Sequence, residues 1–542
     1  MSGRLDRLWV SMVALGYLHM NLSSNASPRW ILHPTFIATS FVLSIAFAND
    51  VEPAGFGRTL LVAVVLAVAL TAIAWALADD RLLGGLIATS LILAAISLRP
   101  LDSLWEAVRA AFGVNAARGV IGGVLFVALS IPAFLIVRAA QGKAPVRGPV
   151  TWALNRLSAV LLAVVVAFHV IPGLPRFVAE ATQRPEALAV HPAAALPDIY
   201  MILMDGYPRA DVLERRFGID NGPFIDELRS LGFEVADDSR SNYVFTQVTL
   251  ASMFQMRQLN DVDGLADLIG TPGSHVTELR DAITKSPVWG TLRAAGYRTV
   301  VNLAGYEHVS LRDTGAEVLD HGEMTDFERV VLGRTWLLDV LKRYVPNVYT
   351  QPWRDRILHG FGDLEELAAT TSPTTPTFAW VHIPAPHLPL VIKGDGTTRR
   401  LDARRFDPAT VAGFGLSEAE LREAYSDELA YLNGRLLRVI GKIEESAART
   451  PERPEPVVVI FSDHGYYYDT NDTQARFANF PATSTPGSPG LFEPTPTPVN
   501  FFRTLFDEYL GTDIAPAKDR YFLSPDIRNL LELKEVPNPD RP

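Results

Sequence analysis

Long apolar runs fill the first third of the chain, whereas shorter ones alternate with polar stretches in the rest. A helix needs about 20 mostly apolar residues to cross the roughly 30 Å of hydrocarbon in a bilayer. The pattern therefore predicts a helical transmembrane bundle of about five spans within residues 1–171. The predicted spans are Trp30–Ala48, Thr59–Ala78, Leu82–Leu98, Gly119–Val137 and Val150–Ile171.

Two further stretches are less apolar. Polar residues interrupt Leu8–Leu22, so we interpret it as interfacial rather than as a sixth span. Leu101–Phe112 mixes apolar residues with Trp105, Glu106 and Arg109, a pattern typical of an amphipathic helix that lies on the membrane surface. No cleavable signal peptide is evident, so the bundle itself would be the anchor.

Charge is distributed unevenly. Residues 1–180 hold 13 Lys/Arg and 8 Asp/Glu, a net of +5, so residues 181–542 carry −16 of the chain's total of −11. Basic residues flank the predicted spans on one side, which places the N-terminus in the cytoplasm of an inner-membrane protein and, after five spans, the C-terminal domain outside. They are Arg4, Arg7, Arg138, Lys143 and Arg147.

Two compositional features exclude classes of function. The acidic C-terminal part lacks the Lys/Arg clusters that a nucleic-acid surface needs. The chain has no cysteine, which excludes disulfides, thiolate metal sites and cysteine nucleophiles.

The pattern changes after a Pro- and Ala-rich linker at residues 172–196. Strand-like apolar runs then alternate with helical patterns at Phe224–Leu231 and Leu416–Glu444, which predicts an α/β domain with a mainly parallel sheet over residues 197–542. We interpret the Pro/Thr/Ser-rich stretch Pro481–Pro498 as a surface loop that covers the site. The strand-like runs are Asp198–Met204, Tyr297–Leu303, Phe378–His382 and Val457–Phe461.

Two of these runs end in an aspartate, where parallel sheets bind ligands. Asp205 follows the first run, although an aspartate there is more often a helix cap or turn former. Asp463 and His464 follow the last run in Ser462-Asp-His-Gly465, and together they offer one oxygen and one nitrogen ligand to a divalent metal.

Two further motifs carry candidate chemistry. Residues 242–254 form a turn that enters a helix whose first turn carries Thr246 and Thr249, either of which could be a simple N-cap or a nucleophile beside the anion-stabilising helix N-terminus. His382 and His387 lie in the proline-stiffened stretch His382-Ile-Pro-Ala-Pro-His-Leu-Pro389, which holds both histidines in fixed places.

These four motifs, in this order and after such spans, resemble the alkaline-phosphatase/sulfatase superfamily. The resemblance is to its sulfatase-like membrane branch, which includes lipoteichoic acid synthases and lipid A phosphoethanolamine transferases, and it covers about residues 197–510. It implies an alkaline-phosphatase-like fold and a divalent metal, either Zn or Mn. It also implies a role for each matching residue: Asp205, Asp463 and His464 as metal ligands, Thr246 as nucleophile and further metal ligand, and His387 as the group that contacts the transferred group or its leaving oxygen.

The spacing to Met253 in the following helix favours Thr246 over Thr249 as the residue that matches the family's nucleophile. We also expect His382, Arg476 and Asn479 to bind substrate; a solvated surface arginine is the alternative for Arg476.

The sequence departs from the family in two places. The Cys-x-Pro-x-Arg motif of formylglycine sulfatases is missing, since the chain has no cysteine and carries Val248 and Leu250 where that motif has Pro and Arg. Gly206 stands where many members have a second carboxylate, which counts against the two-metal site of alkaline phosphatase.

The leading hypothesis is a membrane-anchored phosphotransferase. It would move a phospho-group such as phosphoethanolamine or phosphoglycerol from a lipid donor to an envelope glycan or lipid through a phospho-threonine intermediate. One alternative is a sulfuric or phosphoric ester hydrolase of the sulfatase family, and another is a catalytically inactive sulfatase-like envelope module.

Overall fold

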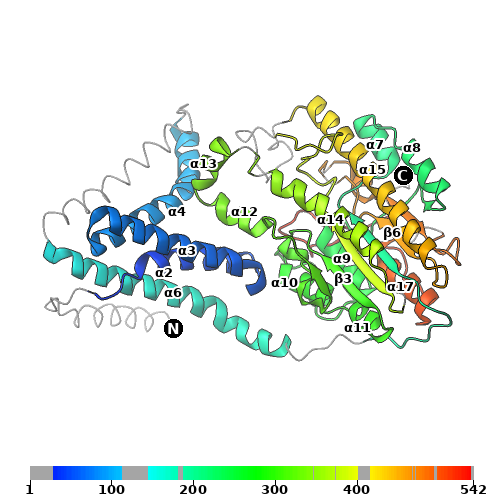
Figure 1. The fold of residues 1–542 in the computed structure, drawn as a ribbon, viewed down its shortest axis with the longest axis horizontal. Coiled ribbons are helices and arrows are strands. Elements are labelled where there is room, and N and C mark those ends of the chain that lie inside the picture. Colours follow the sequence, from blue (N-terminus) through cyan, green and yellow to red (C-terminus); the bar gives the residue numbers. More distant parts are fainter. Residues whose placement is uncertain are drawn as a thin grey trace. The chain divides into compact units, whose positions relative to one another are not determined.

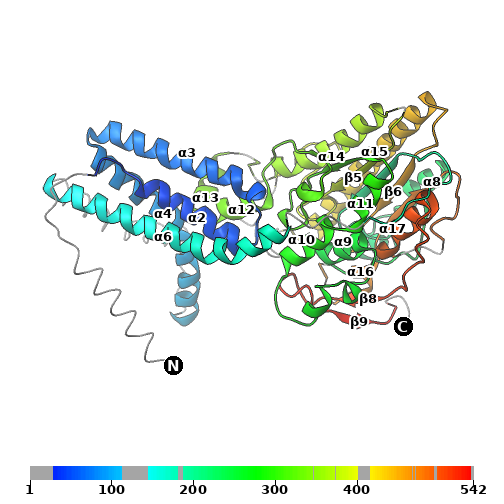
Figure 2. The ribbon, with the colours of Figure 1, turned by 90° about the horizontal axis from the view of Figure 1, so that it is seen from below.

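The computed structural model describes residues 28–112, 144–180, 187–400 and 416–538, apart from positions 346, 349, 373, 467, 470 and 494–496. The predicted span Gly119–Val137 and the stretch Leu8–Leu22 lie outside these residues. The chain divides into two compact units (Figures 1 and 2). The first contains residues 1–178 together with Val330–Leu338, and the second contains the remainder.

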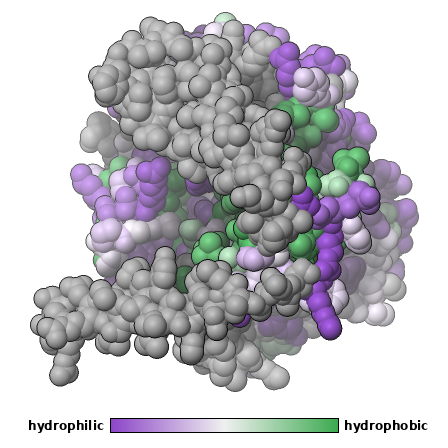
Figure 3. Space-filling view, turned by 90° about the vertical axis from the view of Figure 1, so that its left-hand side faces the viewer, coloured by the Kyte–Doolittle hydropathy of each residue, from purple (hydrophilic) through white to green (hydrophobic). Residues whose placement is uncertain are grey.

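Four described helices come from the apolar N-terminal part: α2 (His33–Ala48), α3 (Pro53–Ala78), α4 (Arg81–Phe112) and α6 (Ala144–Glu180). They cover the four predicted spans that the structure describes. Pro53–Ala78 and Arg147–Ala167 are long and apolar enough to cross a membrane, whereas the apolar parts His33–Ala48 and Arg81–Ile96 are shorter. Large apolar side chains of α3 lie exposed, among them Leu61, Leu66 and Leu77. Hydrophobic residues, coloured green, are also visible on the face of the molecule drawn in Figure 3.

Polar contacts link the starts of these helices. Asn155 of α6 accepts hydrogen bonds from the backbone N–H groups of Leu32 (2.9 Å) and His33 (3.0 Å) at the start of α2. Arg147 of the same helix pairs with Asp80 just before α4. Because Arg147 and Asn155 lie eight residues apart, they share one face of α6 and fix that face against α2 and α4.

Two sequence predictions about this part were wrong in detail. Leu101–Phe112 continues helix α4 rather than forming a separate helix, and α6 extends to Glu180, so the predicted linker at 172–196 begins inside a helix.

A seven-stranded mixed sheet forms the centre of the second unit, in the order β2-β7-β6-β1-β5-β3-β4. The strands β6 (Val457–Phe461), β1 (Ile199–Met204), β5 (Thr377–Ile383), β3 (Arg298–Asn302) and β4 (Glu317–Leu319) run parallel. Four of them confirm the predicted strands and the mainly parallel α/β arrangement, whereas β4 was not predicted. At one edge, β7 (Pro481–Ser484) and β2 (Glu234–Val235) pair antiparallel.

Strand β7 corrects one prediction. The stretch Pro481–Pro498 was expected to be a surface loop, but its first four residues form a strand of the sheet, and its last residue begins α17 (Pro498–Leu505). A proline can stand at position 481 because it is the first residue of β7.

Every residue of β1 is buried because the sheet is covered on both faces (Figure 1). Tyr200, Ile202 and Met204 pack into the core on one face, with apolar residues of α8 (Gly222–Ser230), α14 (Gln351–Ala369) and α15 (Glu418–Arg449). Ile199, Met201 and Leu203 alternate onto the other face, with α9 (Thr246–Gln255), α11 (Pro287–Ala294) and α17. The period-two alternation of a strand thus divides one apolar run between two cores.

Candidate metal centre

Asp205 and Asp463 lie at the carboxyl ends of the neighbouring strands β1 and β6, as the sequence predicted. Both carboxylates are fully buried. Each uses one oxygen within the protein: Asp205 Oδ2 lies 3.0 Å from His382 Nε2, and Asp463 Oδ1 accepts a hydrogen bond of 3.1 Å from the Gly206 N–H. The other oxygens, Asp205 Oδ1 and Asp463 Oδ2, are buried and have no hydrogen-bond partner among the residues that the structure describes.

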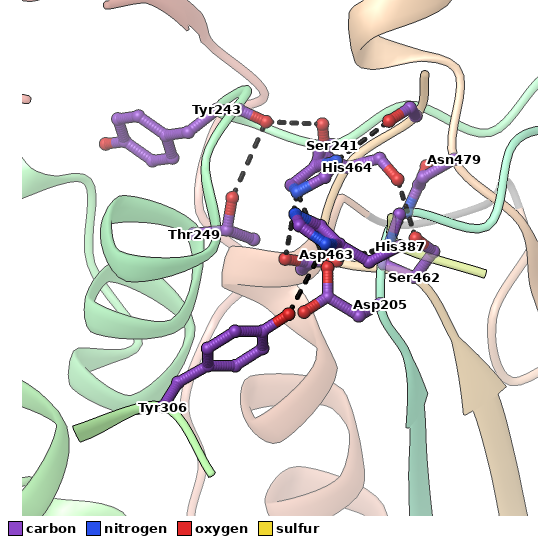
Figure 4. A network of polar contacts seen from close by, with 12 residues as sticks. Asp205, Ser241, Tyr243, Thr249, Tyr306, His387, Ser462, Asp463, His464 and Asn479 are labelled. Carbon is purple, nitrogen blue, oxygen red and sulfur yellow. Dashed lines mark hydrogen bonds and ion pairs between the residues drawn. The ribbon is translucent and has the colours of Figure 1, made fainter. Parts of the chain in front are cut away.

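His464 faces these two oxygen atoms (Figure 4). Its geometry suits a metal ligand rather than a hydrogen-bond donor. Its Nδ1 lies 2.8 Å from the carbonyl oxygen of Gly465, which can only accept, so the ring proton lies on Nδ1 and the lone pair on Nε2. Nε2 lies 3.4 Å from Asp463 Oδ2 and 3.8 Å from Asp205 Oδ1. Both distances exceed that of a good hydrogen bond.

The three facing atoms fit a divalent cation. The ligand atoms of Asp205, Asp463 and His464 lie within 4.8 Å of one another. Ligands at about 2.0–2.1 Å from a tetrahedral zinc ion are separated by about 3.3–3.5 Å, close to the observed spacings. Two buried carboxylate oxygens without a partner carry a large desolvation cost, which a cation between them would offset.

Glycines allow this close approach. Gly206 has a φ of +64°, and a Cβ atom there would lie 3.2 Å from His464 Cε1. A Cβ atom on Gly465 would lie 2.1 Å from the Ala475 carbonyl oxygen. A side chain at position 206 would therefore crowd His464 in a backbone conformation that favours glycine.

His382 lies behind Asp205. Its backbone forms two hydrogen bonds with the Asn302 side chain, and its imidazole is 4% exposed. A histidine that orients a ligating carboxylate is a common feature of metal sites. Burial would raise the pKa of Asp205, but the nearby His387, His382 and His464 hold that pKa below its ordinary value.

His387 is clamped between two tyrosines that the sequence analysis missed. Nδ1 lies 2.7 Å from the Leu388 carbonyl oxygen and 3.3 Å from the Tyr306 hydroxyl, while Nε2 lies 3.1 Å from the Tyr468 hydroxyl. The Tyr468 hydroxyl also accepts a hydrogen bond from the Leu388 N–H. Figure 4 shows the Tyr306 hydroxyl pointing toward this imidazole. Tyr306 follows strand β3, and Tyr468 follows the Asp463-His464 motif, so their positions after strand ends were the available signals.

Thr246 is the first residue of α9, and Phe245 is the N-cap without a side-chain cap bond. Neither threonine hydroxyl therefore caps the helix. Thr249 is fully buried, with its hydroxyl 3.5 Å from the Tyr243 carbonyl oxygen, whereas Thr246 keeps 8% exposure.

Arg476 and Asn479 lie in the segment after the Asp463-His464 motif. The Arg476 guanidinium carbon lies 5.6 Å from the centre of the Phe245 ring, directly before Thr246, and the Arg476 carbonyl accepts a hydrogen bond from the Gly465 N–H at 2.9 Å. Arg476 is buried, which argues against a solvated surface arginine. Both ends of the Asn479 amide contact protein, with Ser462 O at 2.6 Å and Ser239 Oγ at 2.8 Å.

No family model matches the chain. No curated protein matches it. Among solved structures, the zinc complex of the C-terminal periplasmic domain of EcEptC from Escherichia coli is 13% identical, with 65% of this chain and 96% of that chain covered and a TM-score of 0.41.

The lipooligosaccharide phosphoethanolamine transferase EptA from Neisseria meningitidis, an integral membrane protein, is 14% identical over 83% of this chain and 86% of its own, with a TM-score of 0.34. A putative sulfatase from Bacteroides thetaiotaomicron is 14% identical over 60% and 72%, with a TM-score of 0.39.

The structural neighbours are phosphoethanolamine transferases and sulfatases. These are members of the superfamily that the sequence motifs resemble. The identities and TM-scores are low, so the activities of those proteins are not transferred to this chain by the likeness. The roles of the site residues rest on the geometry of this chain.

Proposed function

We propose that this chain is a membrane-anchored, metal-dependent phosphotransferase of the alkaline-phosphatase/sulfatase superfamily, with Thr246 as nucleophile. The observation that carries the proposal is the convergence of Asp205 Oδ1, Asp463 Oδ2 and His464 Nε2, two of them buried oxygens without a hydrogen-bond partner. Asp205, Asp463 and His464 would hold a zinc or manganese ion, with the Thr246 hydroxyl as a further ligand. Such an ion lowers the pKa of a coordinated hydroxyl and stabilises negative charge on a phosphoryl group.

The choice of Thr246 has support from its place in α9. Both threonines are buried, but the Thr249 hydroxyl faces the Tyr243 carbonyl oxygen, whereas Thr246 is the first residue of the helix. Backbone N–H groups at the start of α9 and the nearby guanidinium of Arg476 both favour an anion at this place.

In the proposed reaction, the Thr246 oxygen forms a bond to phosphorus as the bond from phosphorus to the donor's oxygen breaks. The neutral His387 imidazole, whose pKa is lowered by burial, would take the threonine proton and pass it to the leaving oxygen. His387 would donate from Nε2, because its Nδ1–H is directed at the Leu388 carbonyl. A hydroxyl of an envelope glycan or lipid would then attack the phosphorus as the bond from phosphorus to the Thr246 oxygen breaks. His387 would take the proton of the attacking hydroxyl and return it to the Thr246 oxygen.

A lipid donor fits the apolar N-terminal helices, two of which have the length and composition of membrane spans. The two clear span candidates among the described residues are fewer than the roughly five spans that the sequence predicted. The proposal includes a membrane anchor that contains these two helices, an inner-membrane location and a catalytic domain, residues 197–542, outside the cytoplasm. His382 and Asn479 fit positioning roles better than substrate contacts, because their polar atoms contact Asp205 and Ser462.

Covalent labelling tests the proposal. Full-length protein in lipid vesicles is incubated with a phospholipid that carries a radiolabelled headgroup phosphate, then denatured and analysed for bound label. Wild type and Thr249→Ala should be labelled on a peptide that contains residue 246, and Thr246→Ala should not. Labelling of Thr246→Ala at the wild-type level would show that Thr246 is not the nucleophile. Turnover of an aryl sulfate, without labelling by the phospholipid, would favour the hydrolase alternative.

A further inference from the structure

Exposed apolar side chains gather in one segment of the C-terminal part. Among the described residues from 187 onward, the large exposed apolar side chains are Val330 (39%), Leu337 (40%), Tyr344 (72%), Val345 (43%) and Ile527 (60%). Single exposed apolar residues are ordinary on a soluble surface, but a concentration of four within residues 330–345 marks an interaction surface.

This segment forms two short helices with an inner and an outer face. They are α12 (Asp326–Gly333) and α13 (Leu337–Tyr344). Val331 and Leu338 are buried, at 9% and 5%, while their neighbours Val330 and Leu337 are exposed. The inner face therefore already packs against the protein, and the outer apolar face is not needed for the core.

The segment also groups with the apolar helices. Residues Val330–Leu338 belong to the same compact unit as α2, α3, α4 and α6, although they lie more than 150 positions later in the sequence. Within this unit, the backbone N–H of Trp336 donates a hydrogen bond of 3.3 Å to the carbonyl oxygen of Ala95, which lies in the apolar part of α4. Val330 and Leu337 of the outer face thus belong to a compact unit that contains membrane-length helices.

The remaining side chains match a lipid interface. Arg334 and Arg343 are exposed, and the Arg343 guanidinium carbon lies 5.9 Å from the centre of the Tyr344 ring. Aromatic residues beside cationic ones are typical of the headgroup layer, where rings lie at the boundary and cations attract anionic lipids.

We propose that α12 and α13 form a membrane-interface surface, with Val330, Leu337, Tyr344 and Val345 in the headgroup layer of an anionic bilayer and Arg334 and Arg343 on lipid phosphates. This surface is separate from the metal centre and does not depend on the proposed reaction. It adds a second membrane contact to a chain that also carries apolar helices.

The chain has no cysteine, so single cysteines can be introduced without further changes. The variants Leu337→Cys and Tyr344→Cys carry an environment-sensitive fluorophore, and the full-length protein is placed in vesicles of phosphatidylethanolamine and phosphatidylglycerol that contain nitroxide lipids. Ile527→Cys, an isolated exposed apolar position, is the matched control for a water-facing probe. Leu77→Cys, on the exposed face of α3, is the control for a probe in hydrocarbon.

Probes at Leu337 and Tyr344 should lose about half of their fluorescence to a headgroup-proximal nitroxide, whereas the probe at Ile527 should lose none. The proposal is overturned if the probes at Leu337 and Tyr344 show as little quenching as the probe at Ile527 while the probe at Leu77 is quenched. It is also overturned if Leu77 itself is unquenched by deep nitroxides, because the helical unit would then lie outside the bilayer. Arg334→Gln with Arg343→Gln should weaken quenching at Tyr344; unchanged quenching would refute the role of lipid charge.

Discussion

His382 Nε2 lies 3.0 Å from Asp205 Oδ2, on the side of the carboxylate opposite the candidate cation. Removing this imidazole leaves Asp205 without its orienting partner. We predict that His382→Ala lowers the affinity for zinc by about tenfold to a hundredfold without unfolding the domain. Competition with a fluorescent chelator measures this affinity, and His359→Ala, an exposed histidine away from the site, is the control. Equal affinities in the two variants would contradict the positioning role.

Gly206→Ala should reduce metal binding strongly while lowering the free energy of unfolding only slightly. The new Cβ atom would lie 3.2 Å from His464 Cε1 at a backbone φ of +64°. Gly232→Ala is the matched control, because its φ is also positive, at +81°, but nothing lies within 4 Å of the added atom. Both variants should lose about 1 kcal/mol from backbone strain. Gly206→Ala alone should lose bound metal; equal metal content in both variants would show that His464 does not need this space.

Tyr468→Phe should lower kcat more than it raises KM, because the hydroxyl that contacts His387 Nε2 is lost while the ring remains. Tyr466→Phe is the control: it lies in the same loop but packs on Phe217. The effect should vanish when His387 is already replaced by Ala, since Tyr468 acts through that imidazole. Additive effects in the double variant would assign Tyr468 a merely structural role.

Glu428 provides a test of stability against pH. Burial raises the pKa of Glu428 to about 8, partly offset by hydrogen bonds from the N–H groups of Ile392 and Val391. The folded state therefore holds a proton that the unfolded state releases near pH 4.5, so stability falls as pH rises through about 8. Glu428→Gln should remove this fall. Melting temperatures from about pH 4 to about pH 9 should converge below about pH 4.5 and favour the variant increasingly up to about pH 8; parallel curves would refute the raised pKa.

Much of the C-terminal fold could be predicted because the parallel strands are buried on both faces. Fully apolar runs such as Val457–Phe461 indicate central strands, and two of them, Ile199–Met204 and Val457–Phe461, end just before the candidate metal ligands. The edge strand β2 and its neighbour β7 could not be predicted, since Glu234–Val235 has only two residues and Pro481–Ser484 begins with proline. Their pairing depends on tertiary contacts rather than on a local pattern.

The candidate site also has a part that the sequence predicts and a part that it does not. Asp205, Asp463 and His464 follow strand ends, so sheet topology alone predicts that they meet. The position of His382 against Asp205 depends on the register between β1 and β5, where Leu203 pairs with His382, and no single-strand pattern reveals it. Tyr306 and Tyr468 approach His387 from separate loops, a convergence that spacing along the chain does not encode.

The central claim is that Asp205, Asp463 and His464 bind one divalent cation. The most direct test is metal analysis of the purified full-length protein by mass spectrometry, with Glu428→Gln as a control for loss of a buried acid elsewhere. We predict about one zinc or manganese ion per chain in the wild type and the control, and less than about a tenth of that in Asp463→Ala. Wild-type protein without stoichiometric metal, or Asp463→Ala with the wild-type amount, would contradict the account.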